Sequence, residues 1–346
     1  MIKKAFYFII ALTALVIALY FLQPIKKGKG VDTTTHYELV KNWPRFAPVF
    51  KMGNPTGIGI DVNQNIVVLH RANRKWPLLG SMPGDLIKNK TILIIDKENG
   101  KLLDSWGDNF FIMPHGLATD NENNIWVTDV GLHQVFKFNH QGKLLLKLGK
   151  AKLPGNDSLH FNKPTDMAIA KDGSIYICDG YGNSRVVKFS ATGKYLYEWG
   201  KKGGKESEFD IPHGISLDSN GNVYVADREN NRIQVFDSNG RFIKQLGDNS
   251  FGSICSVAFN KTSSKLFSVD DFTFWKIKHR GSDVFVFDST GKVQTRFGRS
   301  GFYEGATTWY HDLAVDEDEN IYVGDILGNT IQKFKKVANR LTIRSP

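Results

Sequence analysis

The chain has 346 residues, of which 41% are hydrophobic and 23% charged, with 33 glycines and two cysteines. These proportions exclude a disordered or collagen-like chain, and two cysteines are too few for a disulfide framework. The formal net charge is +10. Beyond the N-terminal lysines the basic residues are not clustered, which argues against a nucleic-acid-binding surface.

The first predicted element is a membrane-spanning helix over residues 5–22. This run of 18 residues is uncharged and flanked by lysines, and at ~1.5 Å per residue it spans about 27 Å, enough to cross a bilayer core. A cleaved signal peptide is the alternative, but no small-residue cleavage site follows the run. We expect a tail over 1–4, an uncleaved signal anchor, a linker over 23–35 and a main domain on the extracytoplasmic side, secreted if the anchor is cleaved.

Internal repetition organises the rest of the chain. Three similar copies lie over 114–149, 164–200 and 212–247, and each reads as four short strands joined by glycine-containing turns. Weaker copies begin at Pro55, Ser253 and Tyr310. Repeats of this size with four strands are typical of propeller blades. Six copies predict an all-β fold, a six-bladed β-propeller.

The predicted ring closes through the start of the domain. The last copy ends near Phe334 without a clear fourth strand, and residues 36–50 precede the first copy. Pairing these segments removes an exposed sheet edge, which an open solenoid would leave uncovered. The predicted propeller domain therefore covers residues 36–337, followed by a C-terminal tail over 338–346.

The second residue of the opening turn differs between copies. In chain order it is Thr56, His115, Thr165, His213, Cys255 and His311. The three histidines are spaced 98 residues apart, and alternate blades of a six-bladed ring are related by about 120°, so their side chains are expected to meet at the axis. One such histidine would only hydrogen-bond nearby backbone, whereas three with an open fourth position are typical of catalytic zinc. The other six histidines share no repeat position and are expected in loops or on the surface.

A second set of candidates follows the strand that ends in the Val-x-Asp pattern. Arg71 and Arg228 occupy this position in the first and fourth copies, on opposite sides of the ring. Two guanidinium groups facing one channel predict a bound anion such as a substrate carboxylate, although salt bridges to loop acids such as Glu229 are an alternative. Tyr181 follows the same position in the third copy. A phenol beside cations is a candidate general base, or else a packing residue.

Aspartates occur at two kinds of repeat position. The one that ends the Val-x-Asp pattern recurs in nearly every copy and is expected to be structural; it is Asp129, Asp179, Asp227, Asp270 and Asp325. Asp312 differs because it follows His311, where two other copies have Gly116 and Gly214. A carboxylate there is expected to support the histidine or to bind a second cation, with calcium a candidate.

Several runs together resemble peptidyl-α-hydroxyglycine α-amidating lyase, a zinc lyase built on NHL-type repeats. They are MPHGLATDNENNIWVTDVGLHQVFKF, ICDGYGNSRVVKFS, IPHGISLDSNGNVYVADRENNRIQVF and HDLAVDEDENIYVGD. The resemblance covers roughly 36–337. It implies that His115, His213 and His311 hold Zn²⁺ and that Tyr181, Arg71 and Arg228 line the reaction centre. It also implies a structural Ca²⁺ bound at Pro55, Leu117 and Asp312.

Two departures accompany this resemblance. Secreted animal members carry two disulfides, and the matching positions here hold Asn162 with Gly182 and Tyr224 with Val235. No copper monooxygenase domain is attached, so the hydroxylated substrate is expected to come from elsewhere.

The resemblance implies a zinc-dependent lyase that cleaves the N–Cα bond of peptidyl-α-hydroxyglycine, or of a similar N-acyl-α-hydroxyglycine, giving an amide and glyoxylate. The expected partners are this substrate and the membrane. Two alternatives stay open. A non-catalytic NHL-repeat scaffold would have no need for three alternating histidines, and a calcium-dependent propeller lactonase or hydrolase usually holds its metal with carboxylates and amides.

Overall fold

The computed structural model describes residues 35–77, 81–248, 250–274, 278–279, 281–298 and 308–338. These residues form β-strands and one short 3-10 helix, η1 (Arg228–Asn230), with no α-helix among them. The predicted membrane segment, with the tail before it and nearly all of the linker after it, lies outside the described residues. Within the described part, no helix has the length and apolar character needed to cross a membrane.

Blades 1 to 3 are four-stranded antiparallel sheets whose strands follow chain order. Blade 1 contains β2 (Pro55–Ile60), β3 (Ile66–His70), β4 (Ile92–Ile95) and β5 (Leu102–Trp106). Blade 2 contains β6 (Pro114–Thr119), β7 (Ile125–Asp129), β8 (Gln134–Phe138) and β9 (Leu144–Leu148). Blade 3 contains β10 (Asp166–Ile169), β11 (Ile175–Asp179), β12 (Arg185–Phe189) and β13 (Tyr195–Trp199).

Blades 4 to 6 are also four-stranded sheets, but blade 5 carries an additional short strand pair and blade 6 takes its fourth strand from the start of the domain. Blade 4 contains β14 (Pro212–Leu217), β15 (Val223–Asp227), β16 (Arg232–Phe236) and β17 (Phe242–Leu246). Blade 5 contains β18 (Ser253–Asn260), β19 (Lys265–Asp271), β22 (Asp283–Phe287) and β23 (Val293–Gly298), with the short pair β20 (Thr273–Phe274) and β21 (Lys278–His279) after β19. Blade 6 contains β24 (Tyr310–Val315), β25 (Ile321–Asp325), β26 (Thr330–Ala338) and β1 (Thr35–Leu39).

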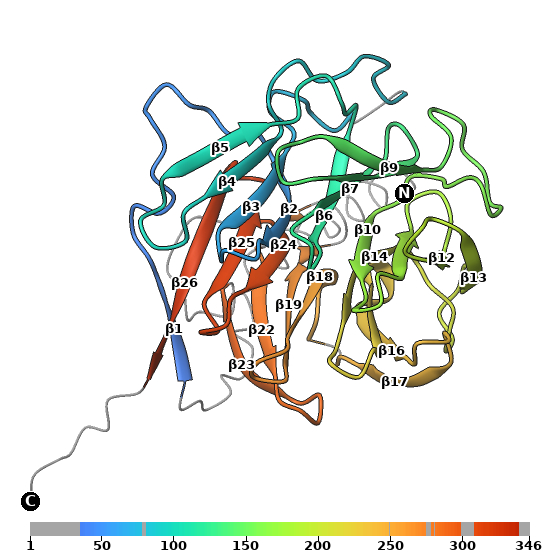
Figure 1. The fold of residues 1–346 in the computed structure, drawn as a ribbon. Helices are drawn as coiled ribbons and strands as arrows, with labels where there is room; N and C mark the ends of the chain where they lie inside the picture. The colour runs from blue at the N-terminus through green and yellow to red at the C-terminus, as the bar shows by residue number, and fades with distance from the viewer. Residues whose placement is uncertain are drawn as a thin grey trace, which may run out of the picture.

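The six sheets form a closed ring. Each innermost strand packs against the innermost strand of the next blade, and β24 of blade 6 packs against β2 of blade 1. The ring is fastened by β1, which lies beside β26 in Figure 1 and runs antiparallel to it. In this pairing Leu39 is opposite Phe334. The predicted closure is therefore confirmed, but the strand ends at Leu39, and the remainder of 36–50 forms turns and loop.

The hydrophobic core lies between adjacent blades. Every residue of the second strand of blades 1, 2, 3, 4 and 6 is buried, because each sheet is covered on both faces. One cluster joins Val67 and Leu69 of blade 1 to Leu117 and Phe136 of blade 2. The core thus fixes the blades relative to one another, which holds the inner strands at the axis.

The recurring aspartate has a structural role where it was predicted, as Asp129 of blade 2 shows. The carboxylate of Asp129 accepts hydrogen bonds from the backbone N–H groups of Ile112 and Met113, just before β6, and of Gly131 and Leu132, just after β7. One side chain therefore ties together two segments beside the first candidate ligand, His115.

Candidate metal centre

Each predicted zinc ligand lies at a β-bulge near the start of an innermost strand. The pairing register shifts across His115 in β6, His213 in β14 and His311 in β24. The same shift occurs at Thr56 and Cys255 in blades 1 and 5. A bulge leaves one residue outside the ladder and re-aims its side chain. The sequence pattern located these residues, and the bulge is the local structure that frees them for a site.

The three histidines meet at the axis, as predicted. Ring centroids are 4.8 Å apart for His115 and His213, 4.6 Å for His115 and His311, and 5.0 Å for His213 and His311. One ligand atom from each ring lies within 4.8 Å of the others, and all three side chains are buried. Residues almost two hundred positions apart in the chain therefore offer one set of nitrogen donors.

A backbone carbonyl of the next blade orients each imidazole. Nδ1 of His115 donates to the Thr165 carbonyl at 2.8 Å, and Nδ1 of His213 donates to the Cys255 carbonyl at 2.6 Å. Nδ1 of His311 donates to the Thr56 carbonyl at 3.0 Å. Because a carbonyl only accepts, the proton lies on Nδ1 and the Nε2 lone pair stays available to a metal.

Burial keeps these histidines neutral. It lowers the pKa of His213 to about 3, and the positive charges of Arg228 and Arg71 act in the same direction. Burial also lowers the pKa of His115 and His311 well below the usual value. Three neutral imidazoles with oriented Nε2 atoms are a donor set that fits zinc, which takes nitrogen ligands and leaves one position for a substrate oxygen in catalytic sites.

Tyr181 lies directly against this triad. Its hydroxyl oxygen is 3.1 Å from Nε2 of His115 and 3.0 Å from Nε2 of His213, and the hydroxyl donates to one of them. Burial raises the pKa of Tyr181, while the charges of Arg228 and Arg71 oppose the shift. The structure therefore brings the predicted base to the predicted ligands.

The loop that carries Tyr181 is fixed without a disulfide. The backbone N–H of Gly182 donates to the Asn162 carbonyl at 2.9 Å. A Cβ at Gly182 would lie 2.1 Å from Cγ of Asn162, so the glycine leaves the space that the Asn162 side chain occupies. The other pair of positions, Tyr224 and Val235, lies directly opposite in the β15–β16 ladder. Both pairs of positions that the resemblance matches to disulfides therefore lie next to each other in this structure.

The two arginines approach Tyr181 with different contacts. Arg71 is 4% exposed, and its Nε donates to the Pro114 carbonyl at 3.0 Å. Its buried Nη2 has no hydrogen-bond partner within the described part of the chain, and burial lowers its pKa to about 10. Arg228 lies on η1 with Nη1 3.5 Å from the Tyr181 hydroxyl and Nε 3.7 Å from a Glu229 carboxylate oxygen. Arg228 therefore contacts both the Tyr181 hydroxyl of the site and Glu229, the loop acid that the sequence offered as an alternative partner.

Trp76 is a site neighbour that the sequence reasoning missed. The guanidinium carbon of Arg71 lies 5.1 Å from its ring centroid, and its ring lies 5.2 Å from that of Tyr181 at 49°. Trp76 belongs to the loop between β3 and β4, which has no counterpart of equal length in the repeats. No repeat signal could have found it.

Two of the three predicted calcium residues lie around one cavity. Asp312 and Leu117 line one cavity of about 250 Å³, but Pro55 is not among its lining residues. The Asp312 carboxylate accepts hydrogen bonds from Ile58 N–H, at 2.6 Å, and from the Ser256 hydroxyl. Burial raises its pKa to about 7. Of the predicted set, Asp312 and Leu117 share this cavity.

Asp166 lines the same cavity and was also missed. Its pKa is raised well above the usual value by burial and by the charge of Asp312. Asp166 holds the repeat position that follows Thr165, equivalent to that of Asp312. The aligned copies could therefore have revealed it.

His70 corrects one expectation. It was expected in a loop or on the surface, but it ends β3 and is 2% exposed. Its Nδ1 accepts hydrogen bonds from the N–H groups of Gly53 at 3.2 Å and Ala72 at 3.1 Å. This imidazole serves the local backbone fold of blade 1.

Comparison with known proteins identifies the family. The NHL repeat family matches residues 111–138, 161–189 and 209–236, which fall in blades 2, 3 and 4. A probable peptidyl-alpha-hydroxyglycine alpha-amidating lyase of Caenorhabditis elegans is 34% identical over 301 residues, which cover 84% of this chain and 85% of that protein. The chain belongs to the peptidyl-α-hydroxyglycine α-amidating lyase family. The predicted family and its lyase class are confirmed.

Some relatives of this lyase are much longer than the chain itself. Peptidyl-glycine alpha-amidating monooxygenase B of Xenopus laevis is 34% identical over 334 residues, covering 90% of this chain, and the chain spans 37% of that protein's length. Among solved structures, a gluconolactonase of Xanthomonas campestris superposes with a TM-score of 0.59 at 15% identity, covering 91% of this chain and 99% of that one. At this identity the likeness shows the propeller fold alone.

Proposed function

We propose that this chain is a zinc-dependent lyase acting on peptidyl-α-hydroxyglycine or a similar N-acyl-α-hydroxyglycine. It breaks the bond between the amide nitrogen and the α-carbon and releases an amide and glyoxylate. One observation carries the proposal: three Nε2 donors meet at the axis, each ring oriented through Nδ1, with a tyrosine hydroxyl against them. Membership of the lyase family supports the reaction class.

The triad provides the metal site. His115, His213 and His311 would hold the ion through Nε2, and zinc bound there would supply Lewis-acid chemistry toward a substrate oxygen. The carbonyl groups behind the three rings fix their orientation, so the donors are arranged before any ion arrives. Preorganisation of this kind lowers the cost of binding.

Tyr181 moves the proton. As tyrosinate, it accepts the proton of the substrate hydroxyl, and the electron pair left on that oxygen forms the carbonyl of glyoxylate. The pair of the breaking N–Cα bond goes to the amide nitrogen, which takes the proton back from Tyr181. Atoms and charge balance, and the tyrosinate is regenerated. The position of its hydroxyl, 3.0 Å from a ligand nitrogen, supports this role.

The two arginines hold negative charge. Both guanidinium groups carry a buried nitrogen without a hydrogen-bond partner within the described residues, Nη2 of Arg71 and Nε of Arg228, and a buried donor needs an acceptor. We assign the substrate carboxylate to Arg71, because Arg228 already lies against the Tyr181 hydroxyl and the Glu229 carboxylate. Arg228 stabilises the phenolate, because its Nη1 lies 3.5 Å from the Tyr181 hydroxyl and a charged donor stabilises an anionic oxygen.

Glyoxylate release from α-hydroxyhippurate tests the proposal. The zinc-loaded full-length protein is expected to form glyoxylate and benzamide in equal amounts, and protein stripped with a chelator is expected to form neither until zinc is restored. Zinc-loaded protein that yields no glyoxylate above the uncatalysed rate overturns the proposed reaction.

Two further expectations stay proposals. A structural calcium ion at Asp312 and Leu117 is supported by the buried carboxylates of Asp312 and Asp166 in one cavity, and metal analysis of Asp312→Asn protein would test it. Anchoring by residues 5–22, with the propeller on the extracytoplasmic side, stays a prediction from the sequence; release of the protein from membranes by carbonate alone would contradict it.

A further inference from the structure

One indole contacts two of the residues that the proposed reaction uses. Trp76 extends from the loop of blade 1, lies with its ring against Tyr181 of blade 3, and receives the guanidinium of Arg71 on its ring. It is 37% exposed, so part of the ring faces solvent beside a buried site. This contact joins loops from two blades at the reaction centre.

The orientation of Arg71 depends on few contacts. Nε is held by the Pro114 carbonyl, and Nη2 is buried without a partner in the described part of the chain. The indole is the flat surface against which the rest of the guanidinium rests. An arginine recognises a carboxylate through two N–H groups in a fixed plane, so its plane must be set before the anion arrives.

We propose that Trp76 is a positioning residue, which holds the guanidinium of Arg71 in the plane that receives the carboxylate of the substrate. The identity of the substrate rests on the proposed function, whereas the contact between the two side chains does not. Loss of the indole frees the guanidinium to rotate, so binding of a carboxylate must then order it. Loss of the indole should therefore weaken the binding of ligands that carry the carboxylate and leave the binding of ligands without it unchanged.

The test compares Trp76→Phe and Trp76→Ala in the zinc-loaded full-length protein. Titration calorimetry measures binding of N-benzoylglycine, which lacks the reactive hydroxyl, and of its uncharged amide. We expect Trp76→Ala to weaken binding of the acid by about tenfold and Trp76→Phe by less than about threefold, because phenylalanine keeps an aromatic face. Binding of the amide should change by less than about twofold in both. The KM for α-hydroxyhippurate should rise with the acid's Kd, with a smaller change in kcat.

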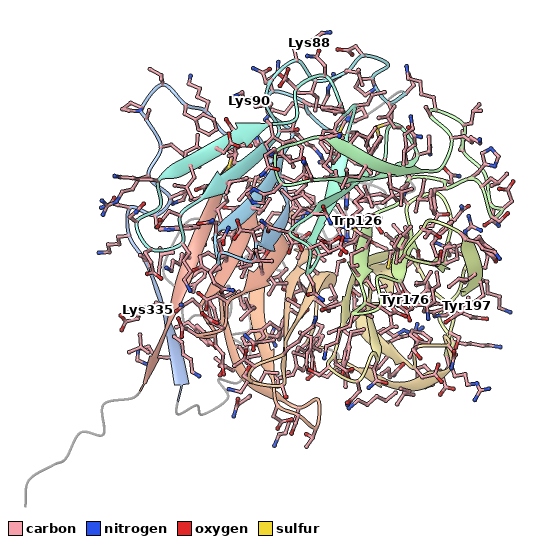
Figure 2. All side chains as sticks on the ribbon, in the orientation of Figure 1. Lys88, Lys90, Trp126, Tyr176, Tyr197 and Lys335 are labelled. Atoms are coloured by element: carbon pink, nitrogen blue, oxygen red, sulfur yellow. The ribbon has the colours of Figure 1, made fainter. Side chains whose placement is uncertain are left out.

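Tyr197→Ala is the matched control. Tyr197 also carries a cation on its ring, since Nζ of Lys188 lies 5.4 Å from its centroid, and Figure 2 shows it on the outer side of blade 3 beside Tyr176. Loss of this aromatic should leave binding of the acid unchanged. This control measures the effect on acid binding of removing an aromatic–cation pair that lies away from the axis.

Three results would overturn the positioning role: equal weakening for acid and amide, a Trp76→Phe protein as impaired as Trp76→Ala, or wild-type protein that does not bind N-benzoylglycine. The two proposals fail separately. Protein that binds the acid in a Trp76-dependent way but releases no glyoxylate would refute the lyase reaction and keep the positioning role. A KM and a kcat for α-hydroxyhippurate that are both unchanged in Trp76→Ala would refute the positioning role and keep the lyase reaction.

Discussion

The three even-numbered blades and the three odd-numbered blades have the same strand arrangement, but they contribute different groups to the site at the axis. At the bulge, blades 2, 4 and 6 supply His115, His213 and His311, whereas the odd blades supply the carbonyl groups that accept from their Nδ1 atoms. Each ligand is therefore positioned by its neighbour in the ring. A sixfold scaffold becomes a threefold site through a change of side chain at one repeat position.

Removal of one even-blade ligand should have the largest effect. His213→Ala leaves two imidazoles, and we expect zinc affinity to fall at least about 100-fold, with turnover reduced at least as much. Calorimetric zinc binding and the glyoxylate assay measure both quantities. His160→Ala is the control, because His160 pairs with Asp157 outside the axis. Full zinc content and full turnover in His213→Ala would refute the ligand assignment.

Repeated and unrepeated positions differ in how well they can be predicted. Equivalent residues of the copies share one backbone environment, so the alternation of His115, His213 and His311 was enough to predict their convergence. The fold and its closing strand followed from the same repetition. Trp76 could not be predicted, because a long loop in one blade places it by packing that no other copy repeats. Asp166 was visible in the aligned copies and was overlooked.

Substitution of Tyr181 should distinguish metal binding from proton transfer. Tyr181→Phe keeps the ring and removes the hydroxyl that lies against His115 and His213. We expect zinc affinity to stay within about threefold while kcat falls by about 10² to 10³, the usual contribution of a positioned acid–base group. Tyr176→Phe in the same blade is the control, since its hydroxyl donates to the Ser238 carbonyl. Turnover above a tenth of the wild-type value would contradict the assigned role.

His70 shows that burial alone does not make a histidine a ligand. Its Nδ1 accepts from two backbone N–H groups, the reverse of the arrangement in the triad, so its lone pair is already used. Burial lowers its pKa to about 4. Between pH 6.5 and 4 His70 is protonated in the unfolded chain but stays neutral in the folded chain. The contribution of the neutral side chain to the free energy of unfolding is therefore intact above this window and is lost as pH falls through it.

The expected loss at His70 amounts to about 3 kcal/mol between pH 6.5 and 4. His70→Asn keeps a side-chain acceptor without this titration. Urea unfolding at several pH values should therefore give a difference between wild type and His70→Asn that changes by this amount across the window. A difference that does not change with pH would show that His70 does not titrate as a buried neutral group.

The smallest effect should come from an odd-blade side chain. The Thr165 hydroxyl donates to the buried Pro212 carbonyl at 2.7 Å, while the carbonyl of the same residue holds His115. Thr165→Val removes only the hydroxyl, so we expect a loss of about 1 kcal/mol in unfolding free energy and zinc affinity within about threefold of wild type. Thr56→Val is the matched control, because its hydroxyl bond to the Pro114 carbonyl is longer, at 3.3 Å, and should cost less. Unfolding in urea and calorimetric zinc binding separate the two quantities. If Thr165→Val lowered zinc affinity tenfold or more, the odd blades would act through their side chains, and the assignment of orientation to backbone carbonyl groups would be wrong.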